Sequence, residues 1–437
     1  MGRHSRFAYE RLSPTESQPR FADGLRALAY RDFRLLWISL LISQLGNWMQ
    51  LVANSWLLLQ LTNSPFLLGL QGLFTSLPFI ASSIFGGALA DRVDRRKLVQ
   101  VMQLCMLASA TLQGALVQMG VIQVWHIYLL GSFNWAVGAF DMAGRQALLP
   151  TLVPRSHMSS AIALNSTLRR GTGILGPALG GMAIAGLGLS GAYWANAASF
   201  APVIVALAMM RSSGPAPAGR GHSFARSMLD GLRYAGKQPL IAGLLGLEAF
   251  NGIFSNATPL MAVFARDVLG VGAQGLGALL AMLGVGALIG AGLLMAAGRA
   301  LVRGPIILLA TVLNPVALIF FALSHRYGFS LAMLVLVGLF DMVGGALRQT
   351  AIQLEVEERF RGRTMGLLSI AGRGVSPLGG VQSGAVASLL SAPIAVALGA
   401  AVTVAWSLST AFRTREIVRF EERQLPAEPA PVRVEVA

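Results

Sequence analysis

Long apolar runs recur along almost the whole chain. Between Phe66 and Ala90, for example, glutamine, serine and threonine are the only polar residue types. About 20 consecutive apolar residues are enough to cross the hydrocarbon core of a bilayer as a helix. The 437-residue chain holds about a dozen such runs. We therefore expect an all-α membrane protein with nearly all of its length in lipid.

The runs predict twelve transmembrane helices in two pseudo-symmetric six-helix bundles. The helices are expected at 33-60, 66-90, 98-119, 124-149, 157-186, 191-211, 240-263, 275-297, 305-323, 329-351, 364-389 and 393-412. The corresponding segments are a cytoplasmic N-terminal segment at 1-32, an N-terminal bundle at 33-211, a cytoplasmic linker at 212-239, a C-terminal bundle at 240-412 and a cytoplasmic tail at 413-437.

The placement of basic residues predicts the orientation. Cytoplasmic loops of membrane proteins carry an excess of lysine and arginine. With the N-terminus in the cytoplasm, 27 of the 34 basic residues lie in cytoplasmic segments and five lie within helices. Only Arg266 and Arg326 then lie on the external side. Both termini are therefore expected in the cytoplasm, with the chain in a bacterial inner (plasma) membrane. The net charge of +15 does not indicate a nucleic-acid partner, because no basic stripe is interleaved with exposed aromatic residues.

Several chemistries have no counterpart in the sequence. There is no phosphate-binding loop, no nucleophile elbow and no histidine or carboxylate cluster with metal-ligand spacing. Cys105 is the only cysteine, which excludes an intramolecular disulfide. We expect no cofactor, no metal and no enzymatic activity.

An internal repeat relates the two halves. The Phe-Asp-Met sequence at 140–142 recurs at 340–342, and Pro177 and Pro377 share the same offset of 200 positions. A duplicated membrane half makes a pseudo-twofold molecule, and such transporters carry their pathway at the interface between the halves.

The segment after the second expected helix reads Gly87-Ala-Leu-Ala-Asp91-Arg92-Val-Asp94-Arg95-Arg96-Lys97. It resembles the G-x-L-A-D-R-x-G-R-R signature of the major facilitator superfamily, with Asp94 where the signature has glycine. The resemblance implies the major facilitator fold and a gate whose members are Gly87, Asp91, Arg92, Arg95 and Arg96. Asp91 would meet the positive N-terminus of a helix, and the arginines would pair with acids on neighbouring helices. The alternative is a plain charge cluster that sets the topology.

Three further segments narrow the resemblance. Residues 140–150, 361–366 and 46–49 are similar to the branch that contains bacterial enterobactin exporters and macrolide-efflux proteins. This resemblance implies secondary transport, usually export coupled to proton entry, by a monomer. The fifth helix resembles a motif associated with exporters, whose members are Gly173, Gly176, Pro177, Gly180 and Gly181. The alternative for these residues is ordinary close packing of helices.

Ionisable residues inside the membrane are costly and therefore mark functional sites. The proton-coupling candidates are Glu248, Asp141 and Asp341. Glu248 shares one helical face with Asn251 and Ser255. Asp141 is expected to pair with an arginine of the gating segment, such as Arg95. The Asp341 helix, with its own arginine at 348, is expected to repeat that arrangement.

The substrate-contact candidates are the remaining polar residues of the helices that line the cavity in this superfamily, together with two arginines. They are Gln44, Asn47, Asn54, Arg170, Asn251 and Arg373. Arg169 and Arg170 point about 100° apart on a helix, so only one is expected to face the cavity. The alternative for the amides is hydrogen bonding between helices. Arg373 is isolated on the eleventh helix, where it would either balance Asp341 or bind an anionic substrate.

The sequence thus predicts a secondary transporter that exports a small molecule, drug-like or a siderophore, by alternating access and proton antiport. Its partners would be that molecule, protons and the lipid bilayer. An importer or lipid flippase on the same fold is the first alternative. A membrane enzyme or assembly factor without transport is the second.

Overall fold

The computed structural model describes residues 25–90, 93–210 and 232–420, and every regular element among them is helical. The N-terminal half contains η1 (Arg26–Ala29), α2 (Arg31–Thr62), α3 (Pro65–Ala90), α4 (Arg95–Gln118), α5 (Val124–Leu152), η2 (Arg155–His157) and α6 (Met158–Met209). The C-terminal half contains α8 (Pro239–Phe254), η3 (Thr258–Leu260), α9 (Met261–Val263), η4 (Phe264–Val268), α10 (Gly272–Ala297), η5 (Gly298–Leu301), α11 (Gly304–Ala322), α12 (Tyr327–Glu355), α13 (Glu358–Ser369), η6 (Ile370–Gly374), α14 (Ser376–Leu389), α15 (Ala392–Arg413) and α16 (Arg415–Val418).

Within the described residues, nine helices are long and apolar enough to cross a membrane. One of them, α6, consists of two arms that meet at Gly188, whose φ of 74° leaves the helical region. Glycine adopts such a positive φ at little cost because it has no Cβ. Neither α5 nor the stretch from α13 to α14 is among the nine. If the two arms of α6 are counted separately and α5 and the α13–α14 stretch are added to the nine, the total accords with the expected twelve.

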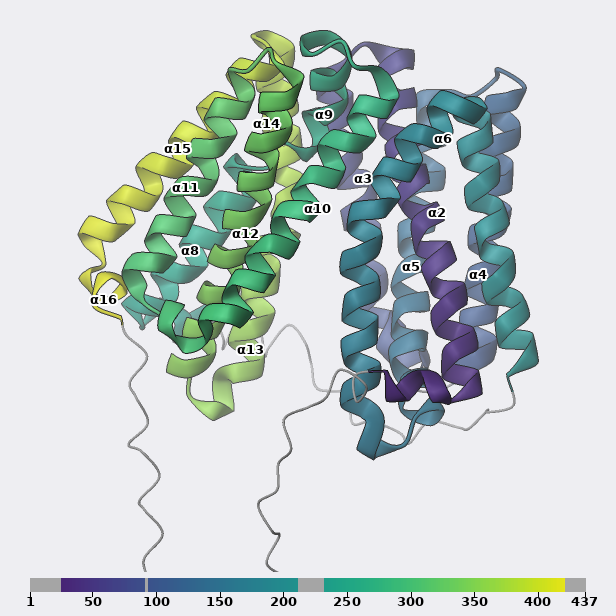
Figure 1. Ribbon diagram of the computed structural model, residues 1–437, viewed down its shortest axis with the longest axis horizontal. Helices are drawn as coiled ribbons and strands as arrows, with labels where there is room; N and C mark the ends of the chain where they lie inside the picture. Colours follow the sequence, from purple (N-terminus) through teal and green to yellow (C-terminus); the bar gives the residue numbers. More distant parts are fainter. Residues whose placement is uncertain (1–24, 91–92, 211–231, 421–437) are drawn as a thin grey trace, which may run out of the picture.

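The two halves lie side by side as separate bundles (Figure 1). They meet at the end that carries α9 and diverge towards the end that carries α13. The helices that join the halves are α3 with α14 and α6 with α10. These pairs approach closely because glycines face backbone: a Cβ on Gly69 would overlap the carbonyl oxygen of Gly380, and one on Gly277 would overlap that of Pro177.

An apolar core holds the α9 end together. It combines buried side chains from both halves, including Val52 and Leu58 of α2 and Leu279 of α10. Phe264 is completely buried there and lies 4.6 Å from the ring of Phe321. Because lipid tails are as apolar as these side chains, close van der Waals packing is what stabilises this contact. The α9 end is therefore the closed end of the molecule.

Two helices expected to be continuous are interrupted, so those predictions were wrong. The helix expected at 240-263 ends at Phe254. The side chain of Asn256 accepts a hydrogen bond from the amide of Thr258 (3.2 Å), a local bond that competes with the helical pattern, and Pro259 disfavours helical geometry at the residue before it. The helix expected at 364-389 contains the π-helical turn η6 before Pro377. Such π turns often occur at functional sites.

Candidate functional site

One cavity lies in the C-terminal half and has a volume of about 370 Å³. Its wall includes Glu248 and Asn251 of α8 and Ser255 directly after it, the three residues predicted to share a face. Asp341 of α12 and Asn256 also line it. We refer to this space as the acidic cavity, because Glu248 and Asp341 are its only charged lining residues among those the structure describes. The structure therefore brings together two of the three proton-coupling candidates.

Glu248 is held by an arginine from another helix. Arg348 Nε donates to Glu248 Oε2 at 2.7 Å, and Arg348 Nη1 donates to Thr311 Oγ1 at 2.8 Å. Arg348 is only 1% exposed, so its guanidinium depends on these partners. Arg348, which shares α12 with Asp341, therefore pairs with an acid of another helix. Position 345, which corresponds to Arg145, is glycine, and the arginine three residues later reaches α8 instead.

Asp341 has no ion pair among the described residues. Its Oδ1 accepts a hydrogen bond of 3.1 Å from the amide of Asn251, and its side chain is open to the acidic cavity. Glu248 and Arg348 both lie close enough to act on its charge. If all three groups are ionised, the cluster of Glu248, Arg348 and Asp341 has a net charge of −1.

The acid of the N-terminal half is buried and paired within its own bundle. Asp141 is 1% exposed and lies 2.5 Å from Arg145 Nη2, one helical turn away. Gln103 Nε2 donates to its other oxygen at 2.9 Å. The expected pairing with Arg95 was wrong, because Arg95 donates to the carbonyl of Ala147 at 2.9 Å. An i,i+4 partner on the same helix needs no movement of a loop to reach the acid.

A second cavity, of about 280 Å³, lies between the halves. Trp48, Arg169 and Arg170 line it from the N-terminal half, and α10 supplies most of the opposite wall. We refer to it as the cationic cavity. Both arginines border it, so the expectation that only one would do so was wrong. Arg170 Nη1 lies 3.1 Å from the sulfur of Met342, the residue after Asp341.

The two cavities adjoin each other. Thr258, Leu283 and Ala287 line both of them. Acids therefore face this region from the C-terminal half, and arginines face it from the N-terminal half.

The predicted polar face of the first helix divides into two parts. Asn54 is buried, and its Oδ1 accepts from Tyr193 (2.7 Å) and Gln113 (3.1 Å). Asn47 Nδ2 donates to Gln44 Oε1 at 3.2 Å. None of these three amides is among the lining residues of the two cavities. The contacts of Asn54 join α2 to α4 and α6, whereas the bond between Asn47 and Gln44 lies within α2. Contact of these amides with substrate stays a prediction.

The gating segment is described only in part. Gly87 lies in the last turn of α3, and Asp91 and Arg92 lie outside the described residues. Arg96 donates to the carbonyl of Ala208 at 2.8 Å and also to that of Met210, at the C-terminal end of α6. Helix C-termini carry partial negative charge, which favours such contacts. The described arginines therefore bind carbonyl oxygens of α5 and α6, where acids had been expected.

The departure of this segment from the family signature has a structural reason. Asp94 is the N-cap of α4, and its carboxylate accepts from the amides of Arg96 (2.9 Å) and Lys97 (3.2 Å). Its φ of −58° needs no glycine. Aspartate is among the preferred N-cap residues.

The glycines of the predicted exporter motif allow α6 to pack closely on two helices. A Cβ on Gly176 would overlap Trp48, and one on Gly180 would lie 3.0 Å from Cα of Met49. A Cβ on Gly181 would lie 2.7 Å from the carbonyl oxygen of Ala273 in the other half. Gly173 lies near Trp48 and lines the cationic cavity. The side chain of Arg373 lies outside the described residues.

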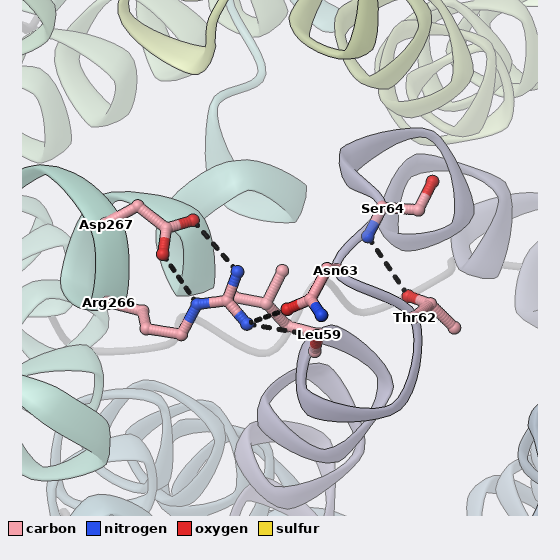
Figure 2. Close-up of polar contacts among 6 residues, drawn as sticks. All are labelled: Leu59, Thr62, Asn63, Ser64, Arg266 and Asp267. Carbon is pink, nitrogen blue, oxygen red and sulfur yellow. Dashed lines mark hydrogen bonds and ion pairs between the residues drawn. The ribbon is translucent and has the colours of Figure 1, made fainter.

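A polar contact between the halves was missed by the sequence analysis. At the closed end, Arg266 of η4 donates from Nη1 to Asn63 Oδ1 (2.7 Å) and to the carbonyl of Leu59 (3.1 Å), as Figure 2 shows. Asn63 follows α2 with a positive φ of 49°, a conformation in which asparagine is enriched. Asp267 holds the same guanidinium at 2.6 Å. The available signal was that Arg266 is one of only two basic residues that the sequence predicts in external loops.

Two helical bundles with cavities in and beside their interface define a transporter of the major facilitator superfamily. Within it, the chain belongs to the transmembrane secretion effector family (MFS_3), whose model matches residues 22–434. The predicted fold class and superfamily are thereby confirmed, and the chain is a transporter and not an enzyme.

Curated relatives of the chain include exporters. It is 25% identical over 376 residues to the enterobactin exporter EntS of Shigella boydii serotype 4 (strain Sb227), across 84% of this chain and 87% of the relative. The same identity and coverage apply to the enterobactin exporter EntS of Escherichia coli O1:K1 / APEC.

Solved structures share the fold at low sequence identity. A bacterial homolog of the human lysosomal transporter Spinster, inward-facing and unoccupied, aligns with a TM-score of 0.65 at 16% identity, over 92% of this chain and 99% of that one. The nucleoside transporter NupG aligns with a TM-score of 0.66 at 12% identity, over 89% of this chain and 100% of that one.

Proposed function

We propose that this protein is a proton-coupled secondary exporter of a small molecule in a bacterial inner membrane, acting as a monomer by alternating access. The observation that supports the proposal most is Asp341, a carboxylate without an ion pair in the described structure, in the wall of the acidic cavity. The curated relatives are named as enterobactin exporters, so a siderophore is one substrate to test, beside drug-like compounds.

Charge balance explains why Asp341 would carry the proton. Asp141 is neutralised by Arg145, and Glu248 is neutralised by Arg348. Asp341 is the unbalanced acid of the three, and an unpaired charge at membrane depth is costly. A proton or a cationic substrate group removes that cost, and the two would compete for the same carboxylate. Glu248 would act with Asp341 because both lie near Arg348.

The end that is open decides which way the proposed state faces. The positive-inside rule assigns the diverging α13 end to the cytoplasm, and the α9 end would then face outwards. The proposed state is inward-open and accepts substrate from the cytoplasm. The gating segment, with Arg95 and Arg96 anchored on α5 and α6, would close that side in the opposite state.

The test is transport into everted membrane vesicles with an imposed pH gradient. Candidate compounds come from a growth screen of a deletion strain under toxic compounds and under iron limitation. Export predicts uptake into vesicles that are acidic inside, and Asp341→Asn should abolish this uptake. Movement in the opposite direction would indicate an importer, and no flux of any compound would indicate a role other than transport.

A further inference from the structure

Charges of opposite sign face the two adjoining cavities from opposite halves of the protein. Asp341 and Glu248 belong to the C-terminal half, and Arg169 and Arg170 belong to the N-terminal half. Because Glu248 is already paired with Arg348, Asp341 is the acid left for an occupant.

The arginines of the cationic cavity are also available. The described contact of the Arg170 guanidinium is with the sulfur of Met342, a weak acceptor. Arg169 makes no side-chain hydrogen bond or ion pair with any other residue that the structure describes. Neither arginine therefore has a carboxylate partner in the described part of the chain, although Asp341 directly precedes Met342.

The remaining walls differ between the two cavities. The acidic cavity offers amides and hydroxyls, from Asn251, Ser255, Asn256 and Ser376. The cationic cavity offers the indole of Trp48 and the aliphatic side chains of Leu280, Leu283 and Leu288. Aromatic rings pack well against such a surface, and indole is the strongest ring partner for cations.

We propose that the two cavities together bind an amphoteric solute with an aromatic or apolar body. Its cationic group would lie at Asp341, and its anionic group would lie at Arg169 and Arg170. The inference rests on the proposed transport function and specifies its substrate class. A solute with one sign of charge would leave charged groups of the protein uncompensated on the other side, and removing such groups from water costs free energy. Complementary charge therefore provides selectivity here.

Three dyes built on one xanthene ring system test this proposal. Rhodamine B carries a cation and a carboxylate, rhodamine 6G carries the cation with the carboxylate esterified, and fluorescein carries the carboxylate without a cation. Binding to the purified full-length protein is measured at neutral pH by fluorescence polarisation. We expect rhodamine B to bind at least about tenfold more tightly than either rhodamine 6G or fluorescein, which corresponds to one buried charge contact.

Single substitutions should separate the two ends of the site. Arg170→Gln should weaken rhodamine B and fluorescein by about tenfold and leave rhodamine 6G unchanged. Asp341→Asn should weaken rhodamine B and rhodamine 6G and leave fluorescein unchanged. The matched control is Arg326→Gln, because Arg326 is a basic residue that lines neither cavity. This substitution should leave the affinity for all three dyes unchanged. Size-exclusion profiles establish that each variant is folded.

Three results would overturn the proposal. One is the failure of rhodamine B to bind, and another is equal binding of all three dyes. The third is a uniform loss of affinity for every dye in Arg170→Gln, which would mean that Arg170 only supports the fold or pairs with Asp341 in the absence of a solute. Binding is measured without a pH gradient. If the dyes bind without selectivity but gradient-driven flux is intact, only the proposed substrate class is rejected. If the dyes bind selectively but there is no gradient-driven flux, only proton-coupled export is rejected.

Discussion

Arg348 of α12 donates a 2.7 Å hydrogen bond to Glu248 of α8, and this pair joins two helices that are a hundred residues apart in the chain. The guanidinium is buried, whereas the carboxylate borders the acidic cavity. The pair therefore fixes one acid of the cavity wall, and Asp341 is the other acid there, without an ion pair among the described residues.

Removing one member of this pair should destabilise the C-terminal half. Glu248→Leu leaves the Arg348 charge buried without its partner, and breaking a buried pair costs about 3–5 kcal/mol. Replacing both residues by leucine should recover most of the loss, because no uncompensated charge remains. The thermal midpoint of purified protein in detergent measures this. Additive losses in the double variant would contradict the account.

The repeat suggests a substitution that changes the charge balance without touching an acid. Gly345→Arg would put an arginine four positions after Asp341, as Arg145 stands four positions after Asp141. The nearest atom to a Cβ at this position is Arg348 Nη2, at 3.9 Å. The first carbon of a new side chain therefore fits without a steric clash. The new ion pair should keep Asp341 charged and abolish the dependence of flux on the pH gradient.

The control for this prediction is Gly345→Gln, which adds a long side chain without charge. Gradient-driven flux in this variant should be at least half of that in the unmodified protein, because only the charge of the new side chain is expected to matter. Coupling that survives in Gly345→Arg would show that Asp341 is not the proton carrier.

The contact between Arg266 and Asn63 should stabilise the closed α9 end. Arg266→Gln removes the hydrogen bonds to Leu59 and Asn63, and a charged hydrogen bond contributes about 1.5–3 kcal/mol. A cysteine at Ser64, in a Cys105→Ala background, should then react several-fold faster with a membrane-impermeant maleimide. Arg326→Gln is the matched control, and an equal rise in that variant would exclude a specific latch.

The proposed orientation is testable with two single cysteines, again in the Cys105→Ala background. Ser156 and His325 are both in exposed positions at opposite ends of the helices. An impermeant thiol reagent added to cells with a permeabilised outer membrane should label His325→Cys and not Ser156→Cys. Everted vesicles should show the reverse pattern. Labelling of Ser156→Cys in the cells would show that the topology is the reverse of the proposed one. The open end of the molecule would then face outwards.

Much of the site on α8 could be predicted from the sequence. Residues 248, 251 and 255 recur at helical spacing within an apolar run, and all three line one cavity. The pairing of Asp141 with Arg145 could also have been predicted from their i,i+4 spacing, although Arg95 was the expected partner. The breaks after Phe254 and at η6 were harder to see, because local hydrogen bonds and prolines there compete with otherwise apolar helical segments.

By itself, the sequence determined where the membrane helices lie, that the molecule is duplicated, and which few polar residues enter the lipid. These properties depend on hydropathy and spacing, which are local along the chain. Only the tertiary structure decided that Arg348 belongs to Glu248, that Asn54 is enclosed by Tyr193 and Gln113, and that Arg170 faces the residue beside Asp341. Electrostatic pairing depends on distances of a few ångströms between atoms of different helices, and those distances are set by how the helices pack.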